Sequence, residues 1–452
     1  MAEERAKFGS KIGVILATAG SAVGLGNVWR FPYMTGENGG AAYIFIYIAC
    51  VIVLGIPCMI AEFLIGRHGA SNTARAYTRL ANGSKWKWIG YLEVLTGFLI
   101  TGYYAVVSGW CLNYVYASIM GELKGDPNYV KDYFVAFSTD PIRPIFWTVA
   151  IFLITHYIIV HGVRNGIEKA SKLMMPTLFI LLLVIVVAAC LLPGASAGIT
   201  FLLKPDFSKV TGDVFLNALG QCFYSMSIAM GCLCTYASYF NRETNLTTSA
   251  IQIGFIDLFV AILAGLMIFP AAFSVGISPD SGPSLIFITL PNVFNQAFSG
   301  APVLGWIIAL LFYALLSLAA LTSLISLHEV NTAFFYEELH ISRKAGAWIV
   351  TLSCAVIGAI CSLSIGQKDT LSLFGKDLFD WFDFVTGQLM LPIGGMLMCV
   401  FVGWVVPQQI VKDELTNWGT LRYHCYSAFV FSMRYVCPLG ILAIMLHQFN
   451  LI

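Results

Sequence analysis

Long apolar segments separated by short polar loops make up most of the chain. A helix needs about 20 predominantly apolar residues to cross the hydrocarbon core of a bilayer. Eleven windows satisfy this requirement, at 12–36, 41–66, 88–118, 144–162, 166–192, 214–240, 248–275, 302–337, 346–364, 377–405 and 428–449. The pattern therefore predicts an all-α polytopic membrane protein. The sequence lacks the short segments of alternating polarity that are typical of a membrane β-barrel.

Two predicted spans are interrupted at corresponding places. The first contains GSAVGLGNVWRFPY, in which Gly24 and Gly26 lower the cost of leaving helical geometry. The sixth contains GQCFYSMSIAMGCLCTYASYF, with Ser225 and Ser227 at mid-span. Unwound backbone survives in a membrane only where protein or a cavity surrounds it, and matching interruptions in two halves are typical of inverted-repeat transporters with a site at the midplane. The first interruption alone is also explained by a glycine-lined packing surface with a proline kink.

Charged residues inside the predicted spans give the next constraint. Arg30 is in the outer part of the first span and Asp383 is near the outer end of the tenth. A charge at this depth is costly unless it is paired or hydrated, so we expect these two residues to form a switchable pair over the site. Asp257 lies inside the seventh span without a basic neighbour in the sequence. Its natural partner is a cation, and a protonated or hydrogen-bonded carboxyl is the alternative.

The eighth span contains the string LAALTSLIS. Ala319, Thr322 and Ser323 stand at positions i, i+3 and i+4, so one carbonyl and two hydroxyls share a helix face. Oxygen ligands of this kind suit sodium. Hydroxyls in membrane helices also bond back to their own helix, so this motif predicts an ion site only together with the interrupted spans.

Composition narrows the functional class. Hydrophobic residues make up 58% of the chain and charged residues 11%, with a formal net charge of +1, whereas soluble chains are typically about 25% charged. A near-neutral chain without a basic block argues against nucleic acid as a partner. The 12 cysteines are scattered, and only Cys232 and Cys234 are close in sequence. Without zinc-like spacing, we expect them to be small buried hydrophobes.

Lysine and arginine are distributed unequally between the two sides of the membrane. If the N-terminus is cytoplasmic, the predicted inner side carries 17 of the 25 Lys and Arg residues and the outer side carries 8. The positive-inside rule therefore predicts a cytoplasmic N-terminus in the inner or plasma membrane, and an odd number of spans places the C-terminus outside. Loops are short, so residues 1–452 are expected to form a single membrane domain.

Three classes of function fit such a membrane domain: a carrier, a channel or an intramembrane enzyme. A channel would also place polar groups at mid-membrane, but paired gates above and below one closed site fit alternating access better. The sequence contains no GxSxG or HExxH string, and its histidines lie mostly at predicted span ends, so the enzyme class has little support.

Several motifs together identify a family resemblance. The chain contains AVGLGNVWRFPY, ENGGAAY followed by GIPCMIAEFLIGRHG, TGYYAVVSGW, TYASY and LTSLIS. From residue 5 to the end of the tenth span it resembles the neurotransmitter:sodium symporter family, and in particular its bacterial eleven-helix branch of multi-hydrophobic amino-acid and tyrosine transporters. The resemblance implies the LeuT fold, with discontinuous helices 1 and 6, inverted five-helix repeats over 12–192 and 214–405, and an extra helix at 428–449.

The resemblance implies sodium-coupled uptake of amino acids by alternating access. An amino-acid sensor or an uncoupled carrier on the same fold is the alternative. Two sodium sites are implied. The first would use the Ala22 carbonyl, Asn27, Ser225, Asp257 and the carboxylate of the substrate. The second would use the carbonyls of Gly20, Val23 and Ala319 with the hydroxyls of Thr322 and Ser323.

The resemblance also implies a substrate site. The substrate carboxylate would meet the amides of Leu25 and Gly26 and the Tyr104 hydroxyl. Its amine would meet carbonyls near Ala22 and Tyr224 and the Ser227 hydroxyl, beside Ser225. Its side chain would lie among Ile100, Tyr224, Met230, Ser323 and Leu327. No charge lines this pocket, so a hydrophobic L-amino acid is expected, and the adaptable methionine would tolerate several shapes.

Two gates are implied at opposite sides of the substrate site. Arg30 and Asp383 match the outer gate, with Tyr104 and Tyr224 as a lid over the substrate. Arg5 and Glu337 match the inner gate, where the family usually has aspartate in place of Glu337. The family also usually has tryptophan at the position of Phe8 and phenylalanine at that of Tyr224.

Chloride use differs within the family. Animal members hold chloride near positions that match Tyr47, Gln221, Ser225 and Ala261. The Ala261 side chain offers no ligand oxygen, whereas Asp257 replaces the usual asparagine and brings a fixed negative charge. We therefore expect sodium ions at two sites and no requirement for chloride.

Overall fold

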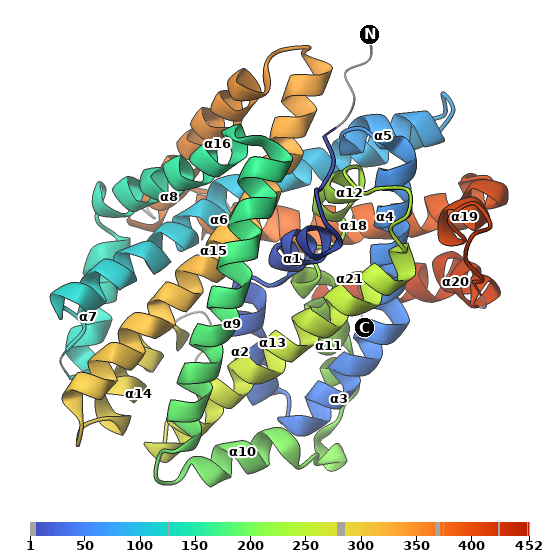
Figure 1. Cartoon of the computed structure of the whole chain (residues 1–452). Helices are drawn as coiled ribbons and strands as arrows, with labels where there is room; N and C mark the ends of the chain where they lie inside the picture. The colour runs from blue at the N-terminus through green and yellow to red at the C-terminus, as the bar shows by residue number, and fades with distance from the viewer. Residues whose placement is uncertain are drawn as a thin grey trace.

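The computed structural model describes residues 6–124, 126–277, 285–366, 371–373, 375–423, 425–449 and 451. Helices dominate this part of the chain (Figure 1). The α-helices are α1 (Lys11–Ala22), α2 (Phe31–Glu37), α3 (Ala41–Cys50), α4 (Ile56–Gly69), α5 (Thr73–Leu80), α6 (Trp88–Met120), α7 (Pro127–Ser138), α8 (Arg143–Val160), α9 (Lys169–Cys190), α10 (Ala195–Leu203), α11 (Gly212–Ser225), α12 (Cys232–Ala237), α13 (Leu246–Ser274), α14 (Thr289–Ala297), α15 (Pro302–Glu338), α16 (Arg343–Gly366), α17 (Leu378–Asp383), α18 (Leu391–Val400), α19 (Gln408–Leu415), α20 (Tyr426–Phe431) and α21 (Cys437–Gln448).

Short elements of other kinds join these helices. Strands β1 (Ser372–Leu373) and β2 (Lys376–Asp377) form a small antiparallel hairpin. Single 3₁₀ turns lie at Lys85–Lys87 and Phe207–Lys209. Segments of π-helix lie at Gly26–Arg30, Val51–Gly55, Val163–Glu168, Phe384–Met390, Phe401–Val405 and Ser432–Val436.

The membrane-spanning helices agree with the hydropathy pattern. Nine helical segments in the described part of the chain are long and apolar enough to cross a membrane, and one bent pair brings the number to ten. The nine are Ala41–Gly69, Lys85–Met120, Arg143–Val160, Val163–Cys190, Leu246–Ser274, Pro302–Glu338, Arg343–Gly366, Leu378–Val405 and Tyr426–Gln448. The remaining predicted window, 214–240, consists of the two shorter helices α11 and α12. The all-α polytopic fold is confirmed.

Both predicted interruptions are present. The segments Lys11–Ala22 and Gly26–Glu37 meet at a bend of 53°. Between α11 and α12 the backbone leaves helical geometry, and Ser227 and Ala229 take φ values of 54° and 63°. Left-handed backbone is uncommon for residues other than glycine, so such residues persist only where their surroundings hold them. The first and sixth spans are therefore discontinuous, as the sequence predicts.

The broken first span lies in the middle of the helix bundle. Helix α1 contacts α9, α13 and α15 in the interior of the molecule (Figure 1). Helices α6 and α15, the third and eighth spans, pack along each other, and α12 packs against α4. The two breaks thus meet where other helices enclose them, which satisfies the requirement that unwound backbone be shielded from lipid.

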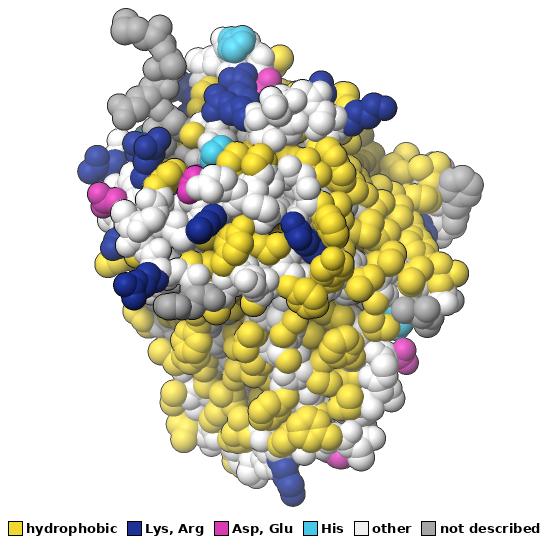
Figure 2. All heavy atoms as spheres, turned by 90° about the vertical axis from the view of Figure 1, so that its right-hand side faces the viewer, with side chains coloured by type: hydrophobic (Ala, Val, Ile, Leu, Met, Phe, Trp, Pro, Cys, Tyr) yellow, Lys and Arg dark blue, Asp and Glu magenta, His cyan; other side chains and the backbone are white. Residues whose placement is uncertain are grey.

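The outer surface of the bundle is apolar. Leu173, Phe255 and Leu352 are each at least 60% exposed, as expected for side chains that contact lipid. On the face in Figure 2, hydrophobic side chains cover most of the surface and Lys and Arg side chains gather toward its upper end. The protein is a multi-pass membrane protein, and the cytoplasmic N-terminus stays a prediction.

Candidate functional site

A small cavity lies between the two broken spans. Its volume is about 40 Å³, and its lining consists of Ser21, Ala22, Gly24, Leu25, Gly26, Ile100, Tyr104, Tyr224, Ser225, Ser227, Met230, Ser323, Ser326 and Leu327. This set includes every residue that the sequence predicts for the substrate site. Ser21, Gly24 and Ser326 complete the lining without having been predicted. Ser326 follows Ser323 by one helical turn, so the helical repeat of the eighth span is the signal that would have found it.

Asp257 is the centre of a buried polar cluster beside this cavity. Its Oδ1 accepts hydrogen bonds from Asn27 Nδ2 at 2.7 Å and from Ser225 Oγ at 3.1 Å. Its Oδ2 accepts a hydrogen bond from the Tyr47 hydroxyl at 3.2 Å. Asp257 is fully buried, and no basic side chain forms an ion pair with it in the described part of the chain. A buried carboxylate surrounded by oxygen groups is suited to bind a cation.

Three of the side chains predicted for the first sodium site therefore converge. The Asn27 side chain also fixes the first break, because its Oδ1 accepts a hydrogen bond from the Gly24 backbone N–H at 3.1 Å. Asp257, on α13, is thus connected through one asparagine to the unwound backbone of the first span. An ion bound here would contact both broken spans and α13 together.

A second group of oxygens lies on the other side of the first break. The Thr322 hydroxyl donates to the Ala319 carbonyl at 2.9 Å and lies 3.4 Å from the Val23 carbonyl. A Cβ placed on Gly20 would lie 3.4 Å from Thr322 Cβ, so Gly20 packs on the same residue. Ser323 lines the small cavity, and its Oγ lies 3.5 Å from the Ser21 carbonyl. The five residues predicted for the second sodium site are thus grouped where α1 packs against α15.

Hydrogen bonds connect the two breaks directly. The Ser227 hydroxyl donates to the Ser21 carbonyl at 2.9 Å, and the Ser21 hydroxyl donates to Ser326 Oγ at 2.9 Å. These contacts join the sixth span to the first and the first to the eighth. The two breaks are therefore held together by side-chain hydrogen bonds.

Tyr104 has a polar atom available at the cavity. In the part of the chain that the structure describes, its buried hydroxyl forms no hydrogen bond of normal geometry, although Ser323 and the Leu25 backbone lie nearby. A buried unsatisfied hydroxyl costs about 1–3 kcal/mol, so its retention in a binding cavity indicates a partner supplied by a ligand. The position next to Leu25 and Gly26 fits the predicted role of meeting the substrate carboxylate.

Glu62 holds the unwound part of the sixth span. From α4, its Oε1 accepts a hydrogen bond from the Ala229 N–H at 2.6 Å, and its Oε2 accepts one from the Cys234 N–H at 3.3 Å. Glu62 is fully buried. Ala229 lies in the unwound segment and Cys234 in the first turn of α12, so neither N–H has an acceptor within a helix, and Glu62 supplies one to each. The sequence motif contains this residue, but the sequence prediction assigned it no role.

A second, larger cavity, here called the vestibule, adjoins the first. Its volume is about 400 Å³, and Arg30 and Asp383 both line it. Leu25, Gly26, Tyr104 and Tyr224 line the vestibule and the cavity alike, so they form the layer that separates the two.

The predicted outer gate pair is not formed. No ion pair joins Arg30 to Asp383 among the residues that the structure describes. The Arg30 guanidinium lies 4.7 Å from the centre of the Tyr224 ring, and Asp383 Oδ1 accepts a hydrogen bond from the Tyr103 hydroxyl at 3.3 Å. The two charges face a shared vestibule with separate partners.

The opposite side of the site is closely packed. Phe8 is buried, and its ring makes edge contacts with Tyr236 and Tyr239 at centroid distances of 5.9 and 6.1 Å. Glu337 Oε2 accepts hydrogen bonds from the backbone and side chain of Asn72. Arg5, its predicted gate partner, lies outside the described residues.

Comparison with known proteins decides the family. The model of the sodium:neurotransmitter symporter family matches residues 5–130 and 128–451. The chain belongs to this family. It is therefore a sodium-dependent membrane transporter and not an enzyme.

Individual relatives extend over the whole chain. An uncharacterized sodium-dependent transporter of Haemophilus influenzae is 36% identical over 99% of this chain and 98% of its own length. YhdH, an uncharacterized sodium-dependent transporter of Bacillus subtilis, is 34% identical, with 100% of both chains covered. The crystal structure of MhsT in complex with L-phenylalanine has a TM-score of 0.87 and 38% identity, covering 98% of this chain and 99% of that one. This symporter therefore has the LeuT fold that the sequence motifs imply.

Gly24 is the position in this symporter where added volume would reach the site most directly. A Cβ at Gly24 would lie 2.4 Å from Ser323 Oγ and 3.3 Å from the Tyr104 hydroxyl. Overpacking of this kind costs about 1–3 kcal/mol, so Gly24→Ala is expected to weaken substrate binding by about 10- to 100-fold. Isothermal titration of purified protein measures this change. The control is Gly212→Ala, where a Cβ meets no atom within 4 Å; equal affinities of the two variants would contradict the prediction.

Proposed function

We propose that this symporter takes up hydrophobic L-amino acids by alternating access, with sodium ions at two sites and no requirement for chloride. The observation that carries the proposal is the cavity between the two broken spans. It is lined by apolar side chains and hydroxyls, and it adjoins the Asp257 cluster through Ser225. The unpartnered Tyr104 hydroxyl and the break at Leu25–Gly26 receive the substrate carboxylate.

The substrate class is inferred from the lining of the cavity. Among the residues that the structure describes, no Lys, Arg, Asp or Glu lines it, and Ile100, Met230 and Leu327 supply its apolar wall. A charged amino-acid side chain would lose its hydration there without gaining a partner. The relative MhsT, crystallised with L-phenylalanine, supports an aromatic or aliphatic substrate.

Coupling follows from groups shared between ion and substrate. In the proposed arrangement, the first sodium ion binds Asp257, Ser225, Asn27, the Ala22 carbonyl and the substrate carboxylate. Each ligand then raises the affinity of the site for the other, and thermodynamic linkage makes this benefit reciprocal. The second ion stabilises the packing of α1 against α15. Its proposed ligands are Gly20, Val23, Ala319, Thr322 and Ser323.

Chloride independence is inferred from the Asp257 carboxylate. Tyr47 and Ser225 both donate hydrogen bonds to this carboxylate, at 3.2 and 3.1 Å. Hydroxyl groups that could otherwise bind chloride therefore already donate to the fixed carboxylate of Asp257. The charge that balances sodium is part of the protein, so no dissolved anion is needed.

Alternating access is inferred from the two sides of the cavity. Toward the vestibule, Tyr104 and Tyr224 separate the cavity from solvent, with Arg30 and Asp383 above them as the proposed outer gate. On the other side, the packing around Phe8 and the proposed pair of Arg5 with Glu337 close the inner route. The two gates open in turn as the broken spans move.

Transport by purified protein in liposomes distinguishes a symporter from a sensor. With sodium outside and potassium inside, we expect radiolabelled L-phenylalanine to accumulate above its equilibrium level, and to leave when the ionophore monensin dissipates the sodium gradient. Replacement of chloride by gluconate on both sides should leave the rate unchanged. Sodium-dependent binding without accumulation would instead support the sensor, and accumulation without sodium an uncoupled carrier.

Thr322→Val tests the second sodium site. The change removes the hydroxyl oxygen and preserves the shape of the side chain, so we expect a sodium affinity about 10-fold weaker, as for the loss of one ligand worth about 1–1.5 kcal/mol. The sodium dependence of substrate binding should also become less steep. The matched control is Thr177→Val, because Thr177 likewise bonds back to its own helix but lies away from the site. The same sodium affinity in both variants would exclude Thr322 as a ligand.

A further inference from the structure

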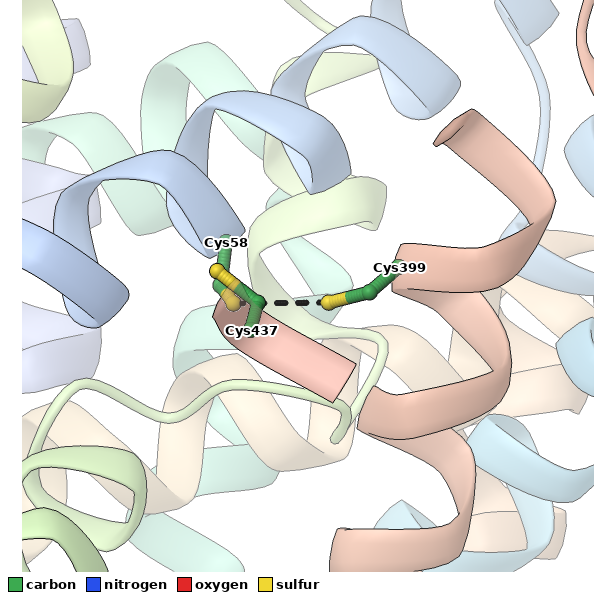
Figure 3. Close-up of side chains that lie close together, drawn as sticks. All are labelled: Cys58, Cys399 and Cys437. Carbon is green, nitrogen blue, oxygen red and sulfur yellow. Dashed lines mark hydrogen bonds between the residues drawn. The ribbon is translucent and has the colours of Figure 1, made fainter. Parts of the chain in front are cut away.

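Three cysteines from distant parts of the chain gather in one buried cluster. Cys58 is on α4, Cys399 on α18 and Cys437 at the start of α21. Their three sulfur atoms all lie within 4.8 Å of one another, and the Sγ atoms of Cys58 and Cys399 are 3.6 Å apart. Figure 3 shows the three side chains pointing toward one another from separate helices. Each residue is completely buried, and the other cysteines that the structure describes form no such group.

The spacing of the sulfurs fits a single metal ion. Three sulfurs bound at a metal–thiolate distance of about 2.3 Å lie about 3.8–4.0 Å apart in tetrahedral or trigonal geometry. The observed separations, 3.6 Å for the Cys58–Cys399 pair and below 4.8 Å for all, require shifts of an ångström or less. Rotation of the cysteine side chains is sufficient for such shifts.

The backbone around the cluster is irregular in all three spans. Segments of π-helix lie directly before α4, directly after α18 and directly before α21, at Val51–Gly55, Phe401–Val405 and Ser432–Val436. The last of these packs against the other two. Insertions of this kind are frequent at functional sites. Three π-helical segments thus surround the thiol cluster, and they distinguish this region independently of its cysteines.

We propose that Cys58, Cys399 and Cys437 form a binding site for the soft monovalent cation Cu(I). Thiolates select soft ions such as Cu(I). Zn(II) prefers four strong ligands, and beside the three sulfurs the described residues offer only the Ser432 hydroxyl, 3.2 Å from Cys437 Sγ. The thiolate is the form of cysteine that ligates a metal, so the coordinating thiols release their protons to solvent as Cu(I) binds.

The bound ion would join three membrane spans. It would fix α4 relative to α18 and α21, and α4 also carries Glu62, one helical turn beyond Cys58, which holds the break of the sixth span. The site is separate from the proposed substrate and sodium sites, so metal binding is measurable without transport.

Anaerobic titration of reduced full-length protein with Cu(I), in competition with the chelator bathocuproine disulfonate, tests the proposal. We expect wild-type protein to retain about one Cu(I) per chain and to unfold at a higher temperature with the ion bound. Cys58→Ala, Cys399→Ala and Cys437→Ala should each retain little copper. The control Cys354→Ala removes a buried cysteine outside the cluster and should bind as wild type does.

X-ray absorption of the copper-loaded wild-type protein tests the same site without any variant. We expect a first shell of sulfur at about 2.3 Å. A shell of nitrogen or oxygen, or retention of copper by a variant lacking all three cysteines, would overturn the proposal. So would failure of the wild type to take up Cu(I) from the chelator, or tight retention of Zn(II) in its place.

Discussion

Asp257→Ala is expected to reduce the sodium affinity of this symporter by at least 100-fold and to abolish binding of a hydrophobic amino acid at ordinary sodium concentrations. Asp257 supplies the only carboxylate of the proposed first sodium site, apart from that of the substrate. Removal of one partner of a buried charge pair typically costs about 3–5 kcal/mol. Scintillation-proximity binding of radiolabelled L-phenylalanine across a sodium series measures the change.

Two further variants make the Asp257 result specific. Asp257→Asn preserves an oxygen ligand and the shape of the side chain but removes the charge, so its sodium affinity should fall between those of the wild type and of Asp257→Ala. Asp132→Ala removes an exposed carboxylate on α7 and should change nothing. If Asp257→Ala binds substrate with undiminished dependence on sodium, Asp257 is not a ligand of the ion.

Glu62→Ala is expected to destabilise the protein by about 3 kcal/mol and to abolish substrate binding. Two backbone N–H groups, those of Ala229 and Cys234, would lose their acceptor inside the protein. Each unsatisfied buried group costs about 1–3 kcal/mol. The unwound segment that carries Ser227 and Met230 would then lose its shape. Thermal unfolding in detergent, followed by intrinsic fluorescence, measures the first effect, and ligand binding measures the second.

Glu62→Gln separates the acceptor role of Glu62 from its charge. The glutamine retains one carbonyl oxygen for one of the two N–H groups, so its stability should lie between those of the wild type and of Glu62→Ala. Glu243→Ala, in an exposed loop, is the control for loss of a glutamate. A Glu62→Ala protein with the wild-type unfolding temperature and affinity would show that the break of the sixth span is held by other contacts.

Much of the architecture was predictable because membrane burial leaves local traces in the sequence. Apolar segments of spanning length predicted the helices, and glycines and serines at mid-span predicted the breaks that the structure contains at Val23 and after Ser225. The family motifs also predicted which residues gather between the two breaks, since all those expected at the substrate site line one cavity there; that this cavity binds the substrate stays a prediction.

Contacts between remote residues of ordinary type were not predictable in the same way. Glu62 acts on backbone groups more than 160 residues away, and an N–H group leaves no signal in the sequence. Cys58 and Cys399 are 341 residues apart, so the expectation of scattered hydrophobic cysteines missed their cluster. The separation of Arg30 from Asp383 depends on the conformation of the vestibule, which side-chain identity alone does not determine.

The proposed joint binding of sodium and a hydrophobic amino acid is tested most directly by equilibrium binding. Radiolabelled hydrophobic amino acids are bound to the purified protein in sodium or potassium, with chloride replaced by gluconate. We expect saturable binding that requires sodium, is unchanged without chloride and is lost in Asp257→Ala. Binding of equal strength in potassium would contradict this coupling, because the substrate carboxylate would then not act as a sodium ligand.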